Sequence, residues 1–287
     1  MSQFNCAKRT VLTAFQYSYL MRVFSSANGA LLVYWLARRA GGADPMKCIF
    51  AASASFCAIA AAFSLNDATD VREDVINNAT RPVAAGNIST RAAITVYVVL
   101  TIFALLSGIA LRSTLGLVTV AAMLLAVSLY SVKIKPLWAA KNIFIAGTVS
   151  MLPILAWSSA PTLLTLDREG AVAMLFLWSL EKEVLADIRD LPGDTCSGLR
   201  TLPRRMGRLP TTLLVGVINV TIWGIFLATR LYAMVGHLHI LLWLASIQTT
   251  VVLLCAAVQT RFWVRTYLRV QVVLTVAALV LLVRLSG

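Results

Sequence analysis

Residues 46–74 read MKCIFAASASFCAIAAAFSLNDATDVRED. Residues 46–65 are almost entirely apolar or small, and an α-helix needs roughly 20 such residues to cross a bilayer. The run then passes directly into Asn66, Asp67, Asp70 and Asp74, whose spacing places the acids on one helix face. A second apolar run ends in the same way, since residues 175–194 read LFLWSLEKEVLADIRDLPGD. The two stretches predict transmembrane helices whose ends carry clustered carboxylates.

The composition of the chain agrees with a membrane protein. Of its 287 residues 59% are hydrophobic and only 13% are charged, whereas a soluble domain has about 25% charged residues. The net charge of +13 would indicate nucleic-acid binding in a soluble protein. Here the basic residues lie between apolar runs, where they orient helices and face lipid headgroups or anionic substrates. We therefore expect the lipid bilayer as a partner and no nucleic acid.

Repeated apolar runs predict an all-α, multi-pass membrane protein with about nine transmembrane helices and a single domain over residues 1–287. The predicted spans are 13–37, 46–65, 92–111, 115–131, 142–160, 170–186, 210–229, 237–258 and 267–285. Most of the 25 Lys and Arg residues then fall on one face of the membrane. The positive-inside rule assigns that face to the cytoplasm. Both acidic segments, within 66–91 and 181–208, lie on it.

The first acidic segment has the residue types of a magnesium site. A polar helix end among lipid headgroups would explain one or two acids, but not three acids with an asparagine. Like charges on one face repel unless a cation lies between them. Magnesium takes carboxylate oxygens and completes its shell with water and substrate phosphate. We predict that Asn66, Asp67, Asp70 and Asp74 bind it.

The second acidic segment suggests that the cation has an anionic partner. Glu183, Asp187, Asp190 and Asp194 recur at helical spacing, and Pro192-Gly193 is expected to break the helix and leave Asp194 on a turn. Two ionised clusters repel each other, and magnesium ions bridged by a diphosphate would resolve that repulsion. Basic residues expected on the same face could grip its phosphates: Arg81, Lys133, Lys135, Lys141, Arg200, Arg204 and Arg205. Each of them alone is equally explained as an orientation signal.

Both segments resemble signatures of the UbiA superfamily of intramembrane prenyltransferases. The first resembles N-D-x-x-D-x-x-x-D followed by N-x-x-x-R-P and a glycine, at Asn66, Asp67, Asp70, Asp74, Asn77, Arg81, Pro82 and Gly86. The second, EVLADIRDLPGDTCSGLRTLP, resembles the later aspartate motif at Glu183, Asp187, Asp190 and Asp194. Between them, LYSVKIK is similar to the tyrosine–lysine segment at Tyr130, Lys133 and Lys135, and Asn142 matches the asparagine that follows. Ala79 departs from the pattern, since the family often has proline there.

The resemblance implies a fold of nine helices around a central cavity that faces the cytoplasm and opens to lipid. Magnesium held by both motifs would bind an allylic polyprenyl diphosphate of C10–C20 or longer. Tyr130 would steady the resulting carbocation through its π face, and Asp187 or Asp190 would deprotonate or orient the acceptor. The residues implied to bind the diphosphate are Arg81, Lys133, Lys135, Asn142 and Arg204.

Three functions remain open from the sequence. The first is prenyl transfer to a small aromatic or lipid acceptor, and the second motif leans toward the lipid and tetrapyrrole branches. The second is a terpene cyclase, in which the cation is captured by the substrate's own double bonds. The third, a secondary transporter, is disfavoured because transporters place ionisable groups near the bilayer midplane, whereas these acids lie at helix ends.

The first predicted helix also carries polar residues near the expected cavity, namely Arg22, Ser25, Ser26 and Asn28. They could contact an acceptor, or they could pack against a neighbouring helix through small side chains. We favour packing.

Overall fold

The computed structural model describes residues 12–40, 44–77, 80–134, 137–159 and 166–228. The elements of this part of the chain are helical, which confirms the all-α prediction. They are α2 (Val23–Arg39), α3 (Pro45–Thr69), α4 (Val71–Asn77), α5 (Thr90–Ala110), α6 (Thr114–Leu129), the π-helical turn η1 (Tyr130–Ile134), α7 (Ala140–Val149), α8 (Met151–Trp157), α9 (Leu166–Cys196), α10 (Leu202–Met206) and α11 (Arg208–Ala228). Residues 12–20 are also helical. The predicted spans 237–258 and 267–285 lie outside the described residues.

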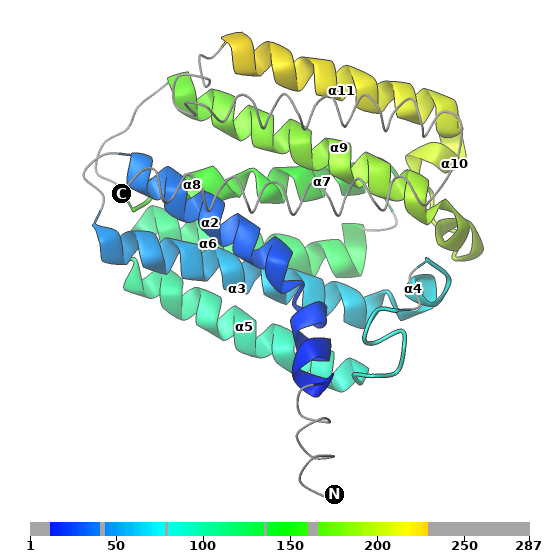
Figure 1. The fold of residues 1–287 in the computed structure, drawn as a ribbon, viewed down its shortest axis with the longest axis horizontal. Helices are drawn as coiled ribbons and strands as arrows, with labels where there is room; N and C mark the ends of the chain where they lie inside the picture. Colours follow the sequence, from blue (N-terminus) through cyan, green and yellow to red (C-terminus); the bar gives the residue numbers. More distant parts are fainter. Residues whose placement is uncertain (1–11, 41–43, 78–79, 135–136, 160–165, 229–287) are drawn as a thin grey trace, which may run out of the picture.

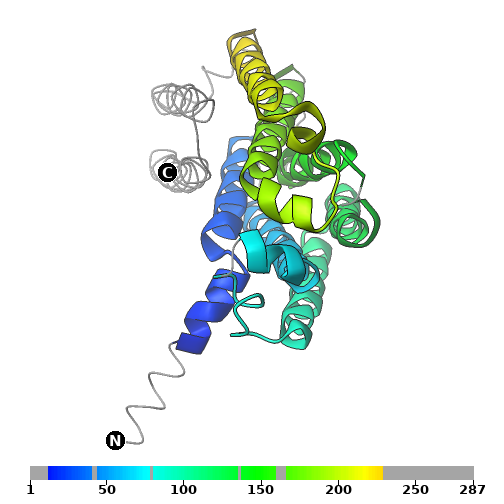
Figure 2. The ribbon, with the colours of Figure 1, turned by 90° about the vertical axis from the view of Figure 1, so that its right-hand side faces the viewer.

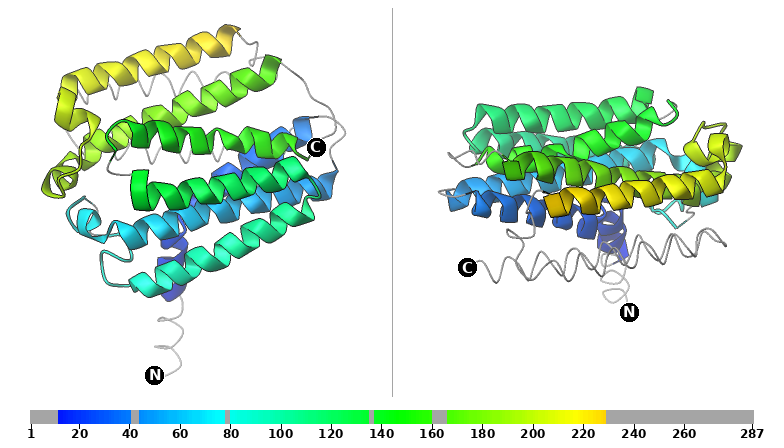
Figure 3. Two further views of the ribbon diagram at one scale, coloured as in Figure 1. Left: turned by 180° about the vertical axis from the view of Figure 1, so that it is seen from behind. Right: turned by 90° about the horizontal axis from the view of Figure 1, so that it is seen from above.

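The long helices lie side by side (Figure 1), with α9 and α11 toward one edge of the bundle and α3 and α5 toward the other. The view in Figure 2 looks onto the end of the bundle, where both α4 and α10 face the reader. Figure 3 shows the same two helices at one end from two further directions. Since α4 carries Asp74 of the first acidic segment and α10 follows the acids of the second, the fold gathers both segments at this end.

Small side chains allow α3 to pack closely against its neighbours α2 and α5. Ala51, Ala54, Ser55 and Ala58 on α3 are buried. On α2, a Cβ atom added to Gly29 would lie only 2.2 Å from the side chain of Ile59. Helix association in lipid depends on such close packing, because the lipid tails are as apolar as the side chains that they replace. These contacts position the carboxyl end of α3, which carries the first acids.

Four of the described helical segments are long and apolar enough to cross a membrane, namely Pro45–Thr69, Thr90–Ala110, Ala140–Trp157 and Arg208–Ile225. α5 leaves Ile102, Phe103, Leu106 and Ile109 more than half exposed. An exposed apolar face of this size on a soluble protein would be a liability, whereas in a bilayer it contacts lipid. These features agree with the predicted multi-pass membrane protein.

The predicted break at Pro192-Gly193 is wrong, because α9 continues through both residues to Cys196. The backbone N–H of Gly193 donates a hydrogen bond to the Asn77 Oδ1 atom of α4 at 2.9 Å. Proline disfavours a helix interior because it lacks an N–H donor and crowds the preceding turn. The contact from α4 supports the backbone at this position, and it places Asp194 in the last turn of the helix instead of on a loop.

The first predicted span is also interrupted. The helix over residues 12–20 ends in a turn at Met21 and Arg22, and α2 begins at Val23. Arg22 adopts the left-handed conformation, with φ 44° and ψ 56°, which costs a non-glycine residue about 1–3 kcal/mol. The Ser26 hydroxyl donates a hydrogen bond to the Met21 carbonyl oxygen across this turn. Strain of this kind persists only where surrounding contacts hold it.

The Asn77–Gly193 contact leads to a first prediction. A Cβ atom added at Gly193 would lie 2.3 Å from Asn77 Nδ2 and 2.5 Å from Asn77 Cγ. Gly193→Ala should therefore destabilise the protein by about 1–3 kcal/mol through overpacking, although alanine is by about 1 kcal/mol the better helix former. Thermal unfolding of the purified protein in detergent would measure the change.

A double-mutant cycle provides the control for this prediction. In an Asn77→Ala background the clash is gone, so Gly193→Ala should lose most of its cost there. An equal loss of stability in both backgrounds would show that Asn77 is not the cause.

Candidate functional site

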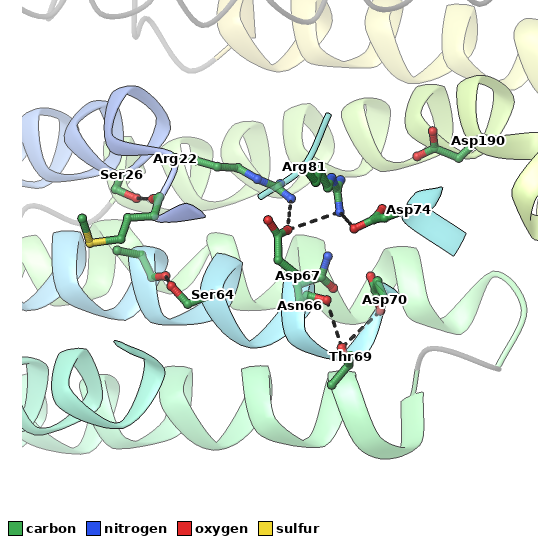
Figure 4. A network of polar contacts seen from close by, with 12 residues as sticks. Arg22, Ser26, Ser64, Asn66, Asp67, Thr69, Asp70, Asp74, Arg81 and Asp190 are labelled. Carbon is green, nitrogen blue, oxygen red and sulfur yellow. Dashed lines mark hydrogen bonds and ion pairs between the residues drawn. The ribbon is translucent and has the colours of Figure 1, made fainter. Parts of the chain in front are cut away.

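Two arginines hold the first acidic segment together (Figure 4). Arg22 Nη2 lies 2.9 Å from Asp67 Oδ1, and Arg81 Nη1 lies 3.3 Å from the same oxygen. Arg81 Nη1 also lies 2.6 Å from Asp74 Oδ2. Asp67 and Asp74 are both almost fully buried. Asp67 in the last turn of α3 and Asp74 in α4 are thus joined through one guanidinium group, and a second guanidinium group shares Asp67.

Asp70 links α3 to α4. It is the C-terminal cap of α3, and its own N–H donates to the Asn66 carbonyl oxygen while its carbonyl oxygen accepts from the Asp74 N–H. Its side chain accepts a hydrogen bond from the Thr69 hydroxyl at 3.1 Å. The backbone therefore continues almost helically from α3 into α4, as the spacing of Asp67, Asp70 and Asp74 predicts. All three acids are buried.

Burial and charge compete at this cluster. Burial raises the pKa of Asp74 to about 6, against the opposing effect of the Arg81 guanidinium. Burial also works to lower the pKa of Arg81, but Asp67 and Asp74 outweigh it and raise that pKa above its ordinary value. The Arg81 charge is therefore firmly held by the carboxylates that it contacts.

The second acidic segment has its own basic partner. Lys141 Nζ lies 2.5 Å from Asp187 Oδ1, and Asn142 Nδ2 donates to Asp187 Oδ2 at 2.9 Å. All three residues are buried. Lys141 was expected just before the predicted span 142–160, but it belongs to α7. The Asn142 amide nitrogen is thus used by Asp187. The Asn142 Oδ1 atom is buried, has no hydrogen-bond partner among the described residues, and is available as an acceptor.

The other acids of α9 differ in exposure. The Asp190 side chain is 23% exposed and pairs with its neighbour Arg189 at 2.5 Å, whereas the Asp187 side chain is 4% exposed. Asp194 is buried in the last turn of α9, next to Gly193 and its contact with Asn77. Glu183 is partly buried one turn before Asp187. The Asn77–Gly193 bond therefore joins the end of the first acidic segment to the end of the second.

The remaining predicted site residues have more varied surroundings. Tyr130 opens the π-helical turn η1 and is partly buried, and Lys133 in the same turn is exposed. Turns of this kind are frequent at functional sites. Arg204 donates hydrogen bonds from Nη1 to the backbone carbonyl oxygens of Asp194 and Leu199, so it caps the end of α9. Lys135 lies outside the described residues.

The donor types at this end of the bundle fit magnesium. The candidate ligands Asn66, Asp67, Asp70, Asp74, Glu183, Asp187, Asp190 and Asp194 offer carboxylate or amide oxygens, which magnesium prefers. In the part of the chain that the structure describes, no three Asp, Glu, His or Cys side chains converge closely enough to hold a metal ion. Asp67 and Asp74 contact guanidinium groups instead, so a bound cation would replace part of those contacts. The buried Asn142 Oδ1 atom beside Asp187 is a further oxygen donor.

Sequence reasoning undervalued two residues of this site. Arg22 was expected to serve helix packing, yet it pairs with Asp67. Its guanidinium carbon also lies 4.2 Å from the centre of the Phe63 ring. Lys141 was considered as a phosphate ligand or as an orientation signal, yet it pairs with Asp187. The available signal was a basic residue within an apolar run, which is costly unless an acid lies opposite.

Comparison with known proteins shows the family of this chain. A sequence model of the UbiA prenyltransferase family matches residues 27–270. The digeranylgeranylglyceryl phosphate synthase of Methanothrix thermoacetophila is 32% identical over 161 residues, which cover 55% of this chain and 58% of that protein. The enzyme of the same name from Pyrococcus horikoshii is 29% identical over 181 residues, covering 62% and 64%. The chain thus spans less than two thirds of the length of either relative.

Solved structures show the same fold. A UbiA homolog from Archaeoglobus fulgidus bound to GPP and Mg2+ superposes with a TM-score of 0.69 at 14% identity, covering 94% of this chain and 99% of that one. The apo structure of a UbiA homolog from Aeropyrum pernix K1 gives a TM-score of 0.71 at 18% identity, covering 92% and 96%. At this identity the likeness establishes the fold, which confirms the predicted fold class.

Proposed function

Because the chain belongs to the UbiA prenyltransferase family, we propose that it is a magnesium-dependent membrane enzyme that transfers the prenyl group of an allylic polyprenyl diphosphate to a glyceryl phosphate acceptor. One observation carries the proposal: two buried acidic segments, 116 residues apart at Asn77 and Gly193, meet through a hydrogen bond at one end of the bundle. The acceptor is suggested by the relatives' name, which describes a glyceryl phosphate with two geranylgeranyl groups. That name favours transfer over cyclisation and over transport.

The acids would hold magnesium in two groups. Asp67, Asp70 and Asp74 with Asn66 form the first, and Glu183, Asp187, Asp190 and Asp194 the second. When bound, magnesium neutralises the diphosphate and helps it to leave. Arg81 contacts Asp67 and Asp74 of the first group and would supply a guanidinium group for phosphate oxygens. Lys133, Lys135, Asn142 and Arg204 remain proposed diphosphate contacts, and the carbonyl contacts of Arg204 also assign it a capping role.

The chain's own residues would guide the reaction as follows. The allylic C–O bond breaks and its electron pair leaves with the diphosphate. The acceptor hydroxyl oxygen then bonds to the allylic carbon, and its proton passes to a carboxylate. Both oxygens of each acid accept hydrogen bonds, from Lys141 and Asn142 at Asp187 and from Arg189 at Asp190. We favour Asp190 for that proton, because its side chain is 23% exposed and that of Asp187 only 4%. Tyr130 would steady the positive charge through its ring.

The metal ligands provide the second prediction. Asp67→Asn and Asp194→Asn should each lower diphosphate release by about a hundredfold or more, since a metal ion supplies several kcal/mol to the transition state. EDTA should abolish turnover and magnesium should restore it. The matched control is Asp44→Asn, because Asp44 is an exposed N-cap of α3 and asparagine caps equally well.

The substrates of this assay test the function itself. Purified protein would be incubated with C10, C15 and C20 allylic diphosphates, with and without a geranylgeranylglyceryl phosphate acceptor. Acceptor-dependent formation of an ether product supports the proposal. A cyclic hydrocarbon or alcohol made without acceptor would instead indicate a cyclase, and the absence of magnesium-dependent diphosphate release would refute enzymatic ionisation.

We further propose that residues 1–287 form one transmembrane domain with the acidic end of the bundle facing the cytoplasm. The extent of the family match supports one domain, and the excess of basic residues on that face supports the orientation.

The orientation gives a third prediction. Cys196 at the end of α9 is exposed. In a variant that retains only this cysteine, a membrane-impermeant maleimide should label it after permeabilisation but not in intact cells. Asp44 is exposed at the amino end of α3, opposite the end that carries Asp67. A cysteine introduced in its place should therefore be labelled in intact cells. Labelling of Cys196 in intact cells would invert the proposed topology.

A further inference from the structure

Arg22 is held in an unusual way in the turn between two helices. Its backbone is left-handed, and the turn that it forms separates the helix over residues 12–20 from α2. Its guanidinium group lies over the Phe63 ring, one turn before Asp67 on α3. The turn and the ring contact together direct the Arg22 guanidinium group toward the first acidic segment from the side of α2. The side chain is 27% exposed, so it is accessible from one side.

Arg22 depends on Asp67 more than Arg81 does. Both guanidinium groups contact the same atom, Asp67 Oδ1, at 2.9 and 3.3 Å. Arg81 has a second carboxylate partner in Asp74. Arg22 forms one ion pair among the described residues, and that pair is with Asp67.

Cation binding would remove that partner. If Asp67 held magnesium, its Oδ1 atom would no longer be available to the two arginines that now share it, and both guanidinium groups would be repelled by the metal charge. Arg81 keeps Asp74, whereas Arg22 loses its carboxylate while Phe63 and the turn hold it in place. A poorly hydrated guanidinium group without a counter-ion is unfavourable, so Arg22 then requires another anion.

The position of Arg22 indicates which anion this is. In Figure 4 Arg22 reaches Asp67 from α2, whereas Arg81, Asp74 and Asp190 lie on the other side of Asp67. Arg81, which pairs with Asp74 as well as Asp67, is the residue proposed above for the diphosphate. The acceptor is the other anionic substrate of the proposed reaction, so the anion at Arg22 is assigned to it.

We propose that Arg22 binds the phosphate of the acceptor, a phosphomonoester, once a metal ion has taken Asp67. This inference rests on the proposed function and deepens it, because it names the residue that selects a phosphorylated acceptor. A guanidinium group suits this role because it binds phosphate through two parallel N–H bonds.

The test compares a geranylgeranylglyceryl phosphate acceptor with the same alkylglycerol lacking phosphate. Full-length protein in phosphate-free maltoside detergent is used, so that no lipid headgroup supplies phosphate. Arg22→Gln should raise the KM of the phosphorylated acceptor by about tenfold or more. The KM values of the unphosphorylated acceptor and of the prenyl diphosphate should stay within about twofold of those of the wild type. This pattern is expected when the variant loses binding energy for one substrate only.

Two further variants separate binding from structure. Arg39 lies at the far end of α2 and is exposed, so the control variant Arg39→Gln should have the KM values of the wild type. Arg22→Lys keeps the charge but loses the paired N–H donors, so it should show a smaller rise confined to the phosphorylated acceptor. If Arg22→Gln does not fold, Arg22→Lys decides. A rise of equal size for both acceptors, or for the prenyl diphosphate, would assign Arg22 a structural role and overturn the proposal.

A binding measurement distinguishes failure of this inference from failure of the proposed function. Calorimetry with glycerol phosphate and magnesium should detect binding to the wild type and loss of binding in the Arg22 variant. If the wild type prenylates neither acceptor, the proposed function fails, and this titration still decides the role of Arg22. Equal binding to both proteins would overturn it.

Discussion

Carboxylates buried at the end of apolar helices require positive charge beside them, and this constraint organises the described structure. Asp67 and Asp74 are matched by Arg22 and Arg81, and Asp187 is matched by Lys141. Leaving a buried charge without its partner typically costs about 3–5 kcal/mol. The basic residues therefore hold the acids in place in the protein alone. In the proposed mechanism a metal ion would displace them from the acids, and they would then bind the phosphates of the substrates.

A second contact fixes how the acidic segments face each other. Asn77 of α4 accepts a hydrogen bond from Gly193 of α9, and it leaves no room for a side chain there. This contact lies three residues after Asp74 and one residue before Asp194. Because it joins the ends of both segments, it sets their separation without itself carrying charge. A shared diphosphate site depends on such positioning as much as on the ligands themselves.

The sequence predicted what depends on composition and local spacing. Apolar length located the helices, and the positions of Asp67, Asp70 and Asp74 along one near-helical course followed from their spacing. What it could not predict depends on contacts between distant residues. Helix α9 passes through Pro192 with Asn77 of α4 bonded to Gly193, and Arg22 adopts a left-handed backbone beside Asp67. The burial of Lys141 likewise depends on where α7 packs against α9.

We propose above all that the two acidic segments form one site for a metal-bound diphosphate. The most direct measurement is an experimental structure of the full chain with Mn2+, which replaces Mg2+ in oxygen sites, and a non-reactive thio analogue of a prenyl diphosphate. We expect metal density at Asp67 or Asp70 and at Asp190 or Asp194, with one diphosphate between them and Arg22 released from Asp67. Metal bound elsewhere, or a diphosphate bound while both arginines remain on Asp67, would contradict a single shared site.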